Sequence, residues 1–122
     1  RILSAMALDP TPLSDSEYHE RSQAVLAAVE ARADQLLQDD VVDIDTHRTG
    51  GLLELVFPNG SKIVINTQPP LHEIWLAARS GGYHFRHVQG RWLDTRTDIE
   101  FFEMLSACAS EQAGKPVRFP SA

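Results

Sequence analysis

The sequence contains a single cysteine, Cys108, among 122 residues. One thiol forms no internal disulfide and no metal site built from several cysteines, so both are excluded. A cytoplasmic protein is the simplest expectation for such a chain. Cys108 falls on the apolar stripe of a predicted helix, which favours a buried core residue over a reactive one.

Long apolar runs are also missing, and so is a basic, apolar leader. No stretch approaches the roughly 20 apolar residues of a membrane-spanning helix, so we expect neither a membrane span nor a secretory signal. We set residues 1–5, which precede Met6, aside as a remnant of expression. The prolines of Asp9-Pro10-Thr11-Pro12 favour a tail. We therefore predict a disordered segment over residues 1–13 and a single domain over residues 14–122.

Recognised catalytic motifs are missing as well, and we expect a protein that is not an enzyme. There is no nucleophile elbow, no glycine-rich phosphate loop and no His-Glu-x-x-His run. Gly50-Gly51 and Gly81-Gly82 are interpreted as turn glycines. The five histidines do not cluster in the sequence. His19 follows Asp15 by four residues, which indicates either a two-ligand site on one helix face or an ordinary surface histidine.

Positive charge is scarce in the first third of the chain. The protein has 17 acidic and 11 basic residues and a net charge of -6. Ten of the acids but only three of the bases lie in residues 1–45. An asymmetric charge of this kind attracts cations or basic partners. It disfavours nucleic acid, whose phosphates it would repel.

Six carboxylates and one cation, Arg32, lie between Glu30 and Asp45, across the predicted end of a helix and the start of a strand. Oxygen ligands of this type suit hard cations such as Ca, Mg, Mn and iron. On charge alone, a solvated acidic face is the more ordinary interpretation of these residues. We call this group the acidic ridge, and its members are Glu30, Asp34, Asp39, Asp40, Asp43 and Asp45.

A first helix is predicted from the capping box Ser14-Asp15-Ser16-Glu17 to the pair Asp39-Asp40. Apolar residues recur in it at three- and four-residue spacing, which indicates one buried face. The segment Val42-Asp43-Ile44-Asp45-Thr46 then alternates, which predicts an edge strand with both aspartates pointing outward. Outward carboxylates on an edge strand also resist aggregation, which is a structural explanation for the two aspartates.

Five further strands and a second helix follow. Asn59-Gly60 between two aliphatic runs predicts a hairpin, and a second capping box, Thr97-Asp98-Ile99-Glu100, predicts a helix that Gly114 ends. This order predicts an α+β fold, a two-layer α/β sandwich in which two helices cover one face of an antiparallel sheet. The predicted strands are Leu52–Phe57, Ser61–Asn66, Glu73–Ala78, Tyr83–His87 and Arg91–Asp94.

Trp75 lies between Ile74 and Leu76, so alternation places its indole on the uncovered face of the sheet. A large aromatic side chain exposed there indicates a protein contact. The alternative is a tryptophan shielded by neighbouring side chains such as Asn66 and Gln68.

Residues 57–77 and 80–85 closely resemble the frataxin family, and its bacterial branch in particular. Four motifs carry the resemblance, in the family's order and spacing, and the similarity extends over about residues 14–119. The motifs are Asn-Gly-Ser-Lys at residues 59–62, Ile-Asn-x-Gln-x-Pro at 65–70, Ile-Trp-Leu at 74–76 and Gly-Gly-Tyr-His-Phe at 81–85.

The resemblance implies a helix, a curved antiparallel sheet and a second helix. It also implies a role in iron–sulfur cluster assembly, with weak binding of Fe²⁺ and Fe³⁺ on the ridge and docking of the same ridge on the cysteine desulfurase. By position, it places iron ligands on Glu30, Asp34, Asp39, Asp40, Asp43 and Asp45, with His19 and Glu20 as weaker candidates. Partner contacts, including those to the iron–sulfur scaffold protein, fall on Asp39, Asp40, Asp43, Asp45, Asn66, Gln68 and Trp75.

Two other functions stay open from the sequence. One is a metal-independent interaction module that uses the open sheet face. The other is a ferroxidase or iron store, which we rank low because the helical Glu-x-x-His motifs of di-iron carboxylate proteins are missing. In each case we expect a monomer in the absence of iron, with no nucleic-acid or membrane partner.

Overall fold

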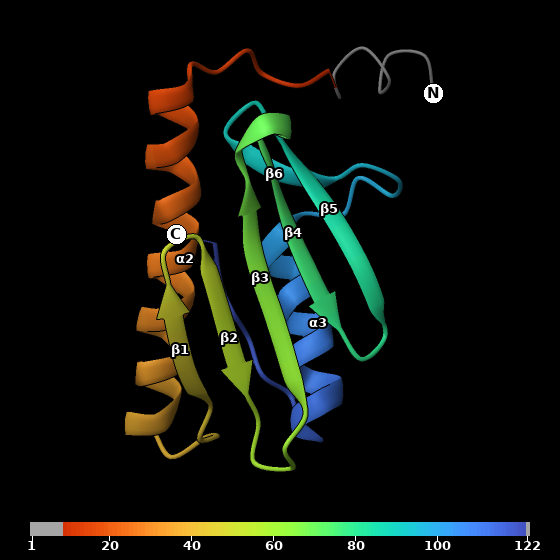
Figure 1. The fold of residues 1–122 in the computed structure, drawn as a ribbon. Helices are drawn as coiled ribbons and strands as arrows, with labels where there is room; N and C mark the ends of the chain where they lie inside the picture. The colour runs from red at the N-terminus through yellow and green to blue at the C-terminus, as the bar shows by residue number, and fades with distance from the viewer. Residues whose placement is uncertain (1–8, 122) are drawn as a thin grey trace.

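The computed structural model describes residues 9–121, in which two helices lie behind a six-stranded sheet (Figure 1). The strands follow one another across the sheet in chain order, and every neighbouring pair is antiparallel. This confirms the predicted α+β two-layer sandwich. The elements are α2 (Asp15–Gln38), β1 (Asp45–Thr49), β2 (Leu52–Val56), β3 (Lys62–Gln68), the 3₁₀ helix η1 (Pro69–Leu71), β4 (Glu73–Ala78), β5 (Gly81–Val88), β6 (Arg91–Asp94) and α3 (Phe101–Ala113).

The predicted capping box begins α2. The Ser14 backbone N–H donates to Glu17 Oε1 at 2.9 Å, and the Glu17 N–H donates to Ser14 Oγ at 3.1 Å. The Ser14 backbone N–H, and then the Ser14 hydroxyl, hold the pKa of the Glu17 carboxyl below its ordinary value. One face of the helix is buried, and Asp39 is its C-cap. The predicted helix is therefore confirmed at both ends.

The core lies between the helices and the inner face of the sheet. The C-terminal segment packs back onto it, because Val117 and Phe119 are buried. Cys108 is also buried, and burial raises the pKa of its thiol. The largest fully buried side chains come from both layers and from this segment: Leu26, Leu36, Leu53, Leu55, Ile63, Ile65, Ile74, Leu76, Phe85, Phe101, Leu105 and Phe119.

The first strand does not begin where the sequence pattern placed it. Pairing with β2 starts at Asp45, opposite Val56, so β1 is Asp45–Thr49 and Asp43 lies in the connection after α2. Val42 and Ile44 are nevertheless buried, and Asp43 is exposed. The alternation therefore reports correctly which side chains enter the core. It does not report which backbone groups pair with a neighbouring strand.

The second capping box is wrong, because α3 is capped by Glu100 and begins at Phe101. The Glu100 carboxylate accepts the backbone N–H of Phe102 at 2.8 Å and of Glu103 at 3.1 Å. Thr97 instead donates its N–H and hydroxyl to the carboxylate of Asp94, at 3.0 and 2.6 Å. Thr97 therefore bonds to the nearby carboxylate of Asp94 and does not cap α3.

The described part of the predicted tail makes specific contacts. The Thr11 N–H donates to the His87 carbonyl at 2.7 Å, and the Gln89 N–H donates to Thr11 Oγ1 at 2.9 Å. Leu13 packs against the core. The prediction of disorder is thus wrong for Thr11 and Leu13, while residues 1–8 lie outside the described residues. Within residues 9–121, neither helix combines the length and apolar character needed to cross a membrane.

Candidate functional site

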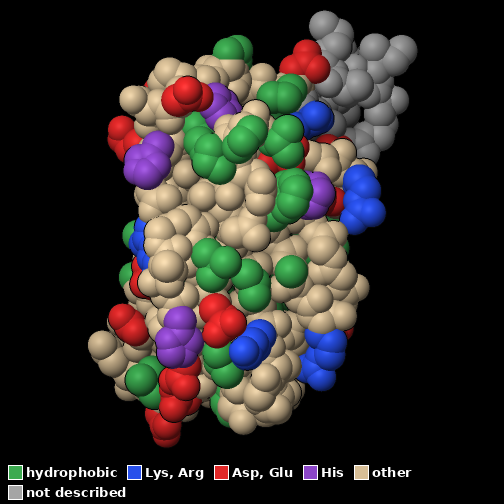
Figure 2. Space-filling view, in the orientation of Figure 1, with side chains coloured by type: hydrophobic (Ala, Val, Ile, Leu, Met, Phe, Trp, Pro, Cys, Tyr) green, Lys and Arg blue, Asp and Glu red, His purple; other side chains and the backbone are tan. Residues whose placement is uncertain are grey.

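The acidic ridge lies where α2 ends and β1 begins. Asp34, Asp39, Asp40, Asp43 and Asp45 are all exposed, as the sequence predicted, and Glu30 is partly buried. Figure 2 shows acidic side chains gathered at the lower left of the molecule, where these two elements meet in Figure 1. Helix and strand therefore place their carboxylates at one end of the protein.

The backbone of α2 adds to the negative potential of this end. A helix carries about half a negative charge at its C-terminus, and natural helices often offset it with a cation in the last turn. The last turn of α2 contains no basic residue, and Asp39 and Asp40 follow it directly. Asp40 also adopts the left-handed backbone conformation, with φ at 57°. Cations and basic surfaces are therefore favoured at this position.

Glu30 differs from the rest of the ridge because it already has a cation. Arg48 of β1 places Nη1 2.7 Å from Glu30 Oε1, and its other terminal nitrogen donates to Gln23. A metal ion at Glu30 would have to compete with this salt bridge. Glu30 remains a predicted ligand, but the five aspartates are the more available part of the ridge.

The carboxylates suit iron by their chemistry, yet they do not converge on one point. Among residues 9–121, no group of three or more His, Cys, Asp or Glu side chains is arranged to hold a metal ion. Exposed oxygen ligands that stay apart fit weak, diffuse binding of hydrated cations better than a preformed centre. The ridge is thus suited to iron as a loosely held cargo.

His19 and Glu20 lie far from the ridge. Both are exposed on the first turns of α2, and the 15 residues from His19 to Asp34 correspond to about 22 Å of helix. Of the two interpretations of His19, the ordinary surface histidine agrees with the structure, because the Asp15 carboxylate lies 2.8 Å from His72 Nε2 instead. The structure therefore does not bring these candidates together with the six ridge carboxylates.

Trp75 lies on the open face of the sheet in a fixed orientation. Its indole N–H donates to Glu73 Oε1 at 2.8 Å, and its ring stacks on His84 with centroids 4.0 Å apart. Trp75 is only partly exposed. Both sequence interpretations are thus partly right: the ring faces solvent, and its neighbours shield it.

Asn66 and Gln68 border Trp75 on the same face. Asn66 is directly opposite Trp75 in the register of β3 and β4, and Gln68 donates to Asn66 at 3.0 Å. Sequence reasoning missed His84, which is opposite Trp75 on β5. The only signal available for it was the period-two alternation of β5, in which His84 precedes the buried Phe85 and is itself exposed. We call Asn66, Gln68, Glu73, Trp75 and His84 the sheet-face patch.

A model of the frataxin-like domain matches residues 11–115 of this chain. The chain belongs to the frataxin-like family. Its relatives in the family include iron–sulfur cluster assembly protein CyaY from Paraburkholderia phymatum, 54% identical over 105 residues, which are 86% of this chain and 96% of that protein. The CyaY protein of Variovorax paradoxus is 50% identical over 110 residues, 90% of this chain and all of that protein.

Solved frataxin structures share the fold. Frataxin from Psychromonas ingrahamii, of the CyaY protein family, is 33% identical, with a TM-score of 0.80 over 89% of this chain and all of that one. Trimeric frataxin from the yeast Saccharomyces cerevisiae, complexed with ferrous iron, is 23% identical, with a TM-score of 0.67 over 93% of this chain and 98% of that one. At that identity the yeast protein supports the fold alone, whereas the bacterial relatives support a role in iron–sulfur cluster assembly.

Proposed function

We propose that this protein is a non-enzymatic adaptor of iron–sulfur cluster assembly that binds iron weakly on the acidic ridge and docks through the same ridge on the cysteine desulfurase. The observation that carries the proposal is the concentration of exposed aspartates at the C-terminal end of α2, whose last turn contains no basic residue. The names of the bacterial relatives support the pathway. We place the protein in the cytoplasm, as a monomer in the absence of iron.

Iron would be held by Asp34, Asp39, Asp40, Asp43 and Asp45 as a cargo. Separate exposed carboxylates replace a few water ligands of the ion without enclosing it, so affinity and selectivity should both be low. The yeast relative complexed with ferrous iron is consistent with this chemistry. Glu30 joins the set only where the ion displaces Arg48, and His19 and Glu20 belong to a separate, weaker surface.

Docking on a partner would use the same carboxylates through long-range attraction. Opposite charges across an interface mainly raise the rate of association and fix the orientation of the partners. Because the aspartates are exposed, salt should screen this attraction strongly. Iron and a basic patch of the desulfurase would then share or compete for one surface.

The test is charge reversal of Asp39, Asp40, Asp43 and Asp45 to Lys in one variant. We expect the variant to keep its fold and to bind the cysteine desulfurase about 100-fold more weakly, because several screened charge pairs of up to roughly 1 kcal/mol each become repulsive. Calorimetry at two salt concentrations measures the loss. Unchanged affinity at low salt would refute ridge docking.

A matched control separates a local effect from net charge. Asp39→Lys with Asp40→Lys changes the charge by the same amount as Glu103→Lys with Glu111→Lys, which lie exposed on α3. Only the pair at Asp39 and Asp40 should weaken docking.

Iron binding is tested by titration of the protein with ferrous ion, followed by NMR. We expect chemical shifts of the ridge residues to change in the unmodified protein and not in the fourfold variant. With ferrous iron in many-fold excess over protein, oxygen uptake faster than that of the same iron in buffer, sustained over many iron equivalents per protein, would instead favour a ferroxidase.

The sheet-face patch is the second candidate surface, for contact with the iron–sulfur scaffold protein. Trp75 is held by both Glu73 and His84, so it would lose little side-chain entropy on binding. Asn66 and Gln68 add polar groups at its edge. If the ridge failed to respond to ferrous ion, a metal-independent module acting through this patch would become the better hypothesis.

A further inference from the structure

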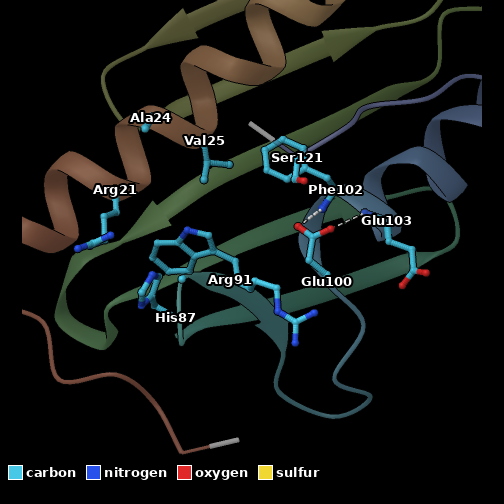
Figure 3. Close-up of a pocket in the computed structure, with 11 residues that line it drawn as sticks. Arg21, Ala24, Val25, His87, Arg91, Glu100, Phe102, Glu103 and Ser121 are labelled. Atoms are coloured by element: carbon cyan, nitrogen blue, oxygen red, sulfur yellow. Dashed lines mark hydrogen bonds between the residues drawn. The ribbon is translucent and has the colours of Figure 1, made fainter.

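A hollow of about 640 Å³ opens between the first turns of α2, strand β6 and the start of α3 (Figure 3). Arg21 and Val25 of α2 form one wall, and Phe102 and Glu103 of α3 the other. The 18 residues from Arg21 to Asp39 correspond to about 27 Å of helix, so the hollow is remote from the acidic ridge. Its volume is within the range of pockets that bind small molecules.

Part of the hollow is apolar and aromatic. Val25, Trp92 and Phe102 are buried side chains that line it. His87 also lines it and contacts Trp92 edge to face, with ring centroids 5.3 Å apart. Flat rings at the base of an open cavity are suited to a ligand with a planar apolar body.

Polar groups of the hollow lack partners. His87 is only 6% exposed, yet its Nδ1 has no hydrogen-bond partner in the structure. A buried polar atom of this kind calls for an explanation, because such groups are almost always bonded. Within residues 9–121, Arg21 and Arg91 make no salt bridge, and the Trp92 indole N–H makes no hydrogen bond. The hollow therefore offers the guanidinium groups of Arg21 and Arg91 and the Trp92 indole N–H as donors beside an apolar base.

The carboxylates near the hollow offset these donors only in part. Both oxygens of Glu100 already accept backbone N–H groups of α3. Glu103 lies on the wall opposite Arg21 (Figure 3). Glu17, one turn before Arg21, is held by Ser14, and the charge of Arg21 also lowers the pKa of its carboxyl, so Glu17 offsets part of the charge of Arg21. The end of the hollow at Arg21 is thus positive, while Glu100 and Glu103 would repel a ligand with several negative charges.

We infer that this hollow binds a small aromatic monocarboxylate. Its carboxylate would lie at Arg21, with the Trp92 indole N–H as a further donor, and its ring would lie against Trp92 and Phe102. The single negative charge of such a ligand complements the positive charge of Arg21, and its planar ring complements the aromatic side chains that line the hollow. Arg91, at the rim, would attract the same charge from solvent.

Benzoate is the probe, with benzamide as its uncharged analogue and inorganic phosphate as an anion without a ring. In ¹H–¹⁵N spectra of the intact chain, we expect millimolar benzoate to shift the indole N–H of Trp92 and the side-chain Nε–H of Arg21 in a saturable way. Benzamide and phosphate should each bind at least about tenfold more weakly than benzoate, because benzamide lacks the negative charge and phosphate lacks the aromatic ring. Equal binding of benzoate and benzamide, or no shift of Trp92, would overturn the proposal.

Two variants complete the test. Arg21→Gln should weaken benzoate binding about tenfold, as expected for loss of one charge-assisted contact. Arg79→Gln removes the same charge from the exposed β4–β5 turn and should leave binding unchanged. The same spectra report whether each variant is folded. If both variants lost benzoate affinity equally, the binding would be non-specific attraction and the proposal would be wrong. The charge reversal of Asp39 and Asp40 together should leave benzoate binding unchanged.

Discussion

The two ends of α2 are built in opposite ways. At the N-terminal end, the Tyr18 hydroxyl donates to the Glu73 carbonyl at 2.6 Å and accepts the Gln68 N–H at 3.0 Å, which ties the helix to β3 and β4. The Tyr18 ring stacks on His72, whose Nε2 lies 2.8 Å from Asp15. Specific hydrogen bonds hold this end to the sheet.

At the C-terminal end, electrostatics opposes stability. Asp39 and Asp40 lie at the negative end of the helix dipole, and Asp40 has a left-handed backbone. One end of the helix thus anchors the fold. The other carries carboxylates that no basic residue of the last helical turn offsets, and a nearby cation, Lys115, donates its Nζ to the Val41 carbonyl at 2.8 Å. Unfavourable charge is expected where binding, rather than stability, has determined the residues.

Tyr18→Phe should remove the hydrogen bonds that hold the N-terminal end of α2 to the sheet, and it should have the largest effect on stability. The substitution keeps the ring but leaves the Gln68 N–H and the Glu73 carbonyl without their shared partner. We expect the free energy of unfolding to fall by about 2–3 kcal/mol, measured by urea unfolding. Burial already raises the pKa of this hydroxyl, in line with its enclosed position.

Tyr83→Phe is the matched control, because the Tyr83 hydroxyl pairs only with Ser80 at an exposed position. Its effect should stay within about 0.5 kcal/mol. Equal losses in the two variants would mean that Tyr18 contributes through its ring alone, and that the anchored end has no special hydrogen bonding.

The same substitution at the two ends of α2 should change stability in opposite directions. Asp40→Asn removes a charge from the negative end of the dipole and keeps a side chain that tolerates φ at 57°, so we expect a gain of about 0.5 kcal/mol. Asp15→Asn removes a charge from the positive end and weakens the contact with His72, so it should destabilise the protein. Urea unfolding at low and high salt measures both effects.

High salt should shrink the two effects together, because both are electrostatic and exposed. A loss of stability in both variants would contradict the contrast between the ends of the helix. If Asp40→Asn were more stable than the unmodified protein and also bound ferrous ion more weakly, the contrast between the two ends of the helix would be supported further.

Local signals in the sequence predicted most of the fold. The capping box at Ser14, the Asn59-Gly60 hairpin and the strict alternation around Trp75 each act within a few residues, and each is confirmed. Two of the errors arose where partners compete. The start of β1 depends on where β2 can pair with it, and Thr97 bonds to Asp94 instead of beginning α3.

The acidic ridge was predictable because it depends mainly on how many acidic residues occur in one segment of the chain. Exposed aspartates in one segment of the chain give an acidic end whatever their exact geometry. The pairing of Arg48 with Glu30, 18 residues away, was not predictable, since it requires knowing that β1 lies alongside α2. The hollow at Arg21 escaped sequence reasoning for the same reason, because its lining comes from four distant parts of the chain.

The smallest expected effect is a pH dependence from His87, which tests the electrostatics of the hollow. Burial, and then the charge of Arg21, lower the pKa of His87 from 6.5. As pH falls below 6.5, the unfolded chain takes up a proton that the folded protein resists, so stability should decrease there and not above it. The other charged groups around the hollow are Arg91, Glu100 and Glu103.

His87→Gln should flatten this dependence between pH 7 and 5, which the difference in urea midpoints measures. Millimolar benzoate should flatten it in the unmodified protein as well, because a carboxylate beside Arg21 favours the protonated imidazole. If the unmodified protein and His87→Gln lost stability in parallel, the titration would belong to other groups. If benzoate left the dependence unchanged while still binding, its carboxylate would lie at Arg91, away from His87.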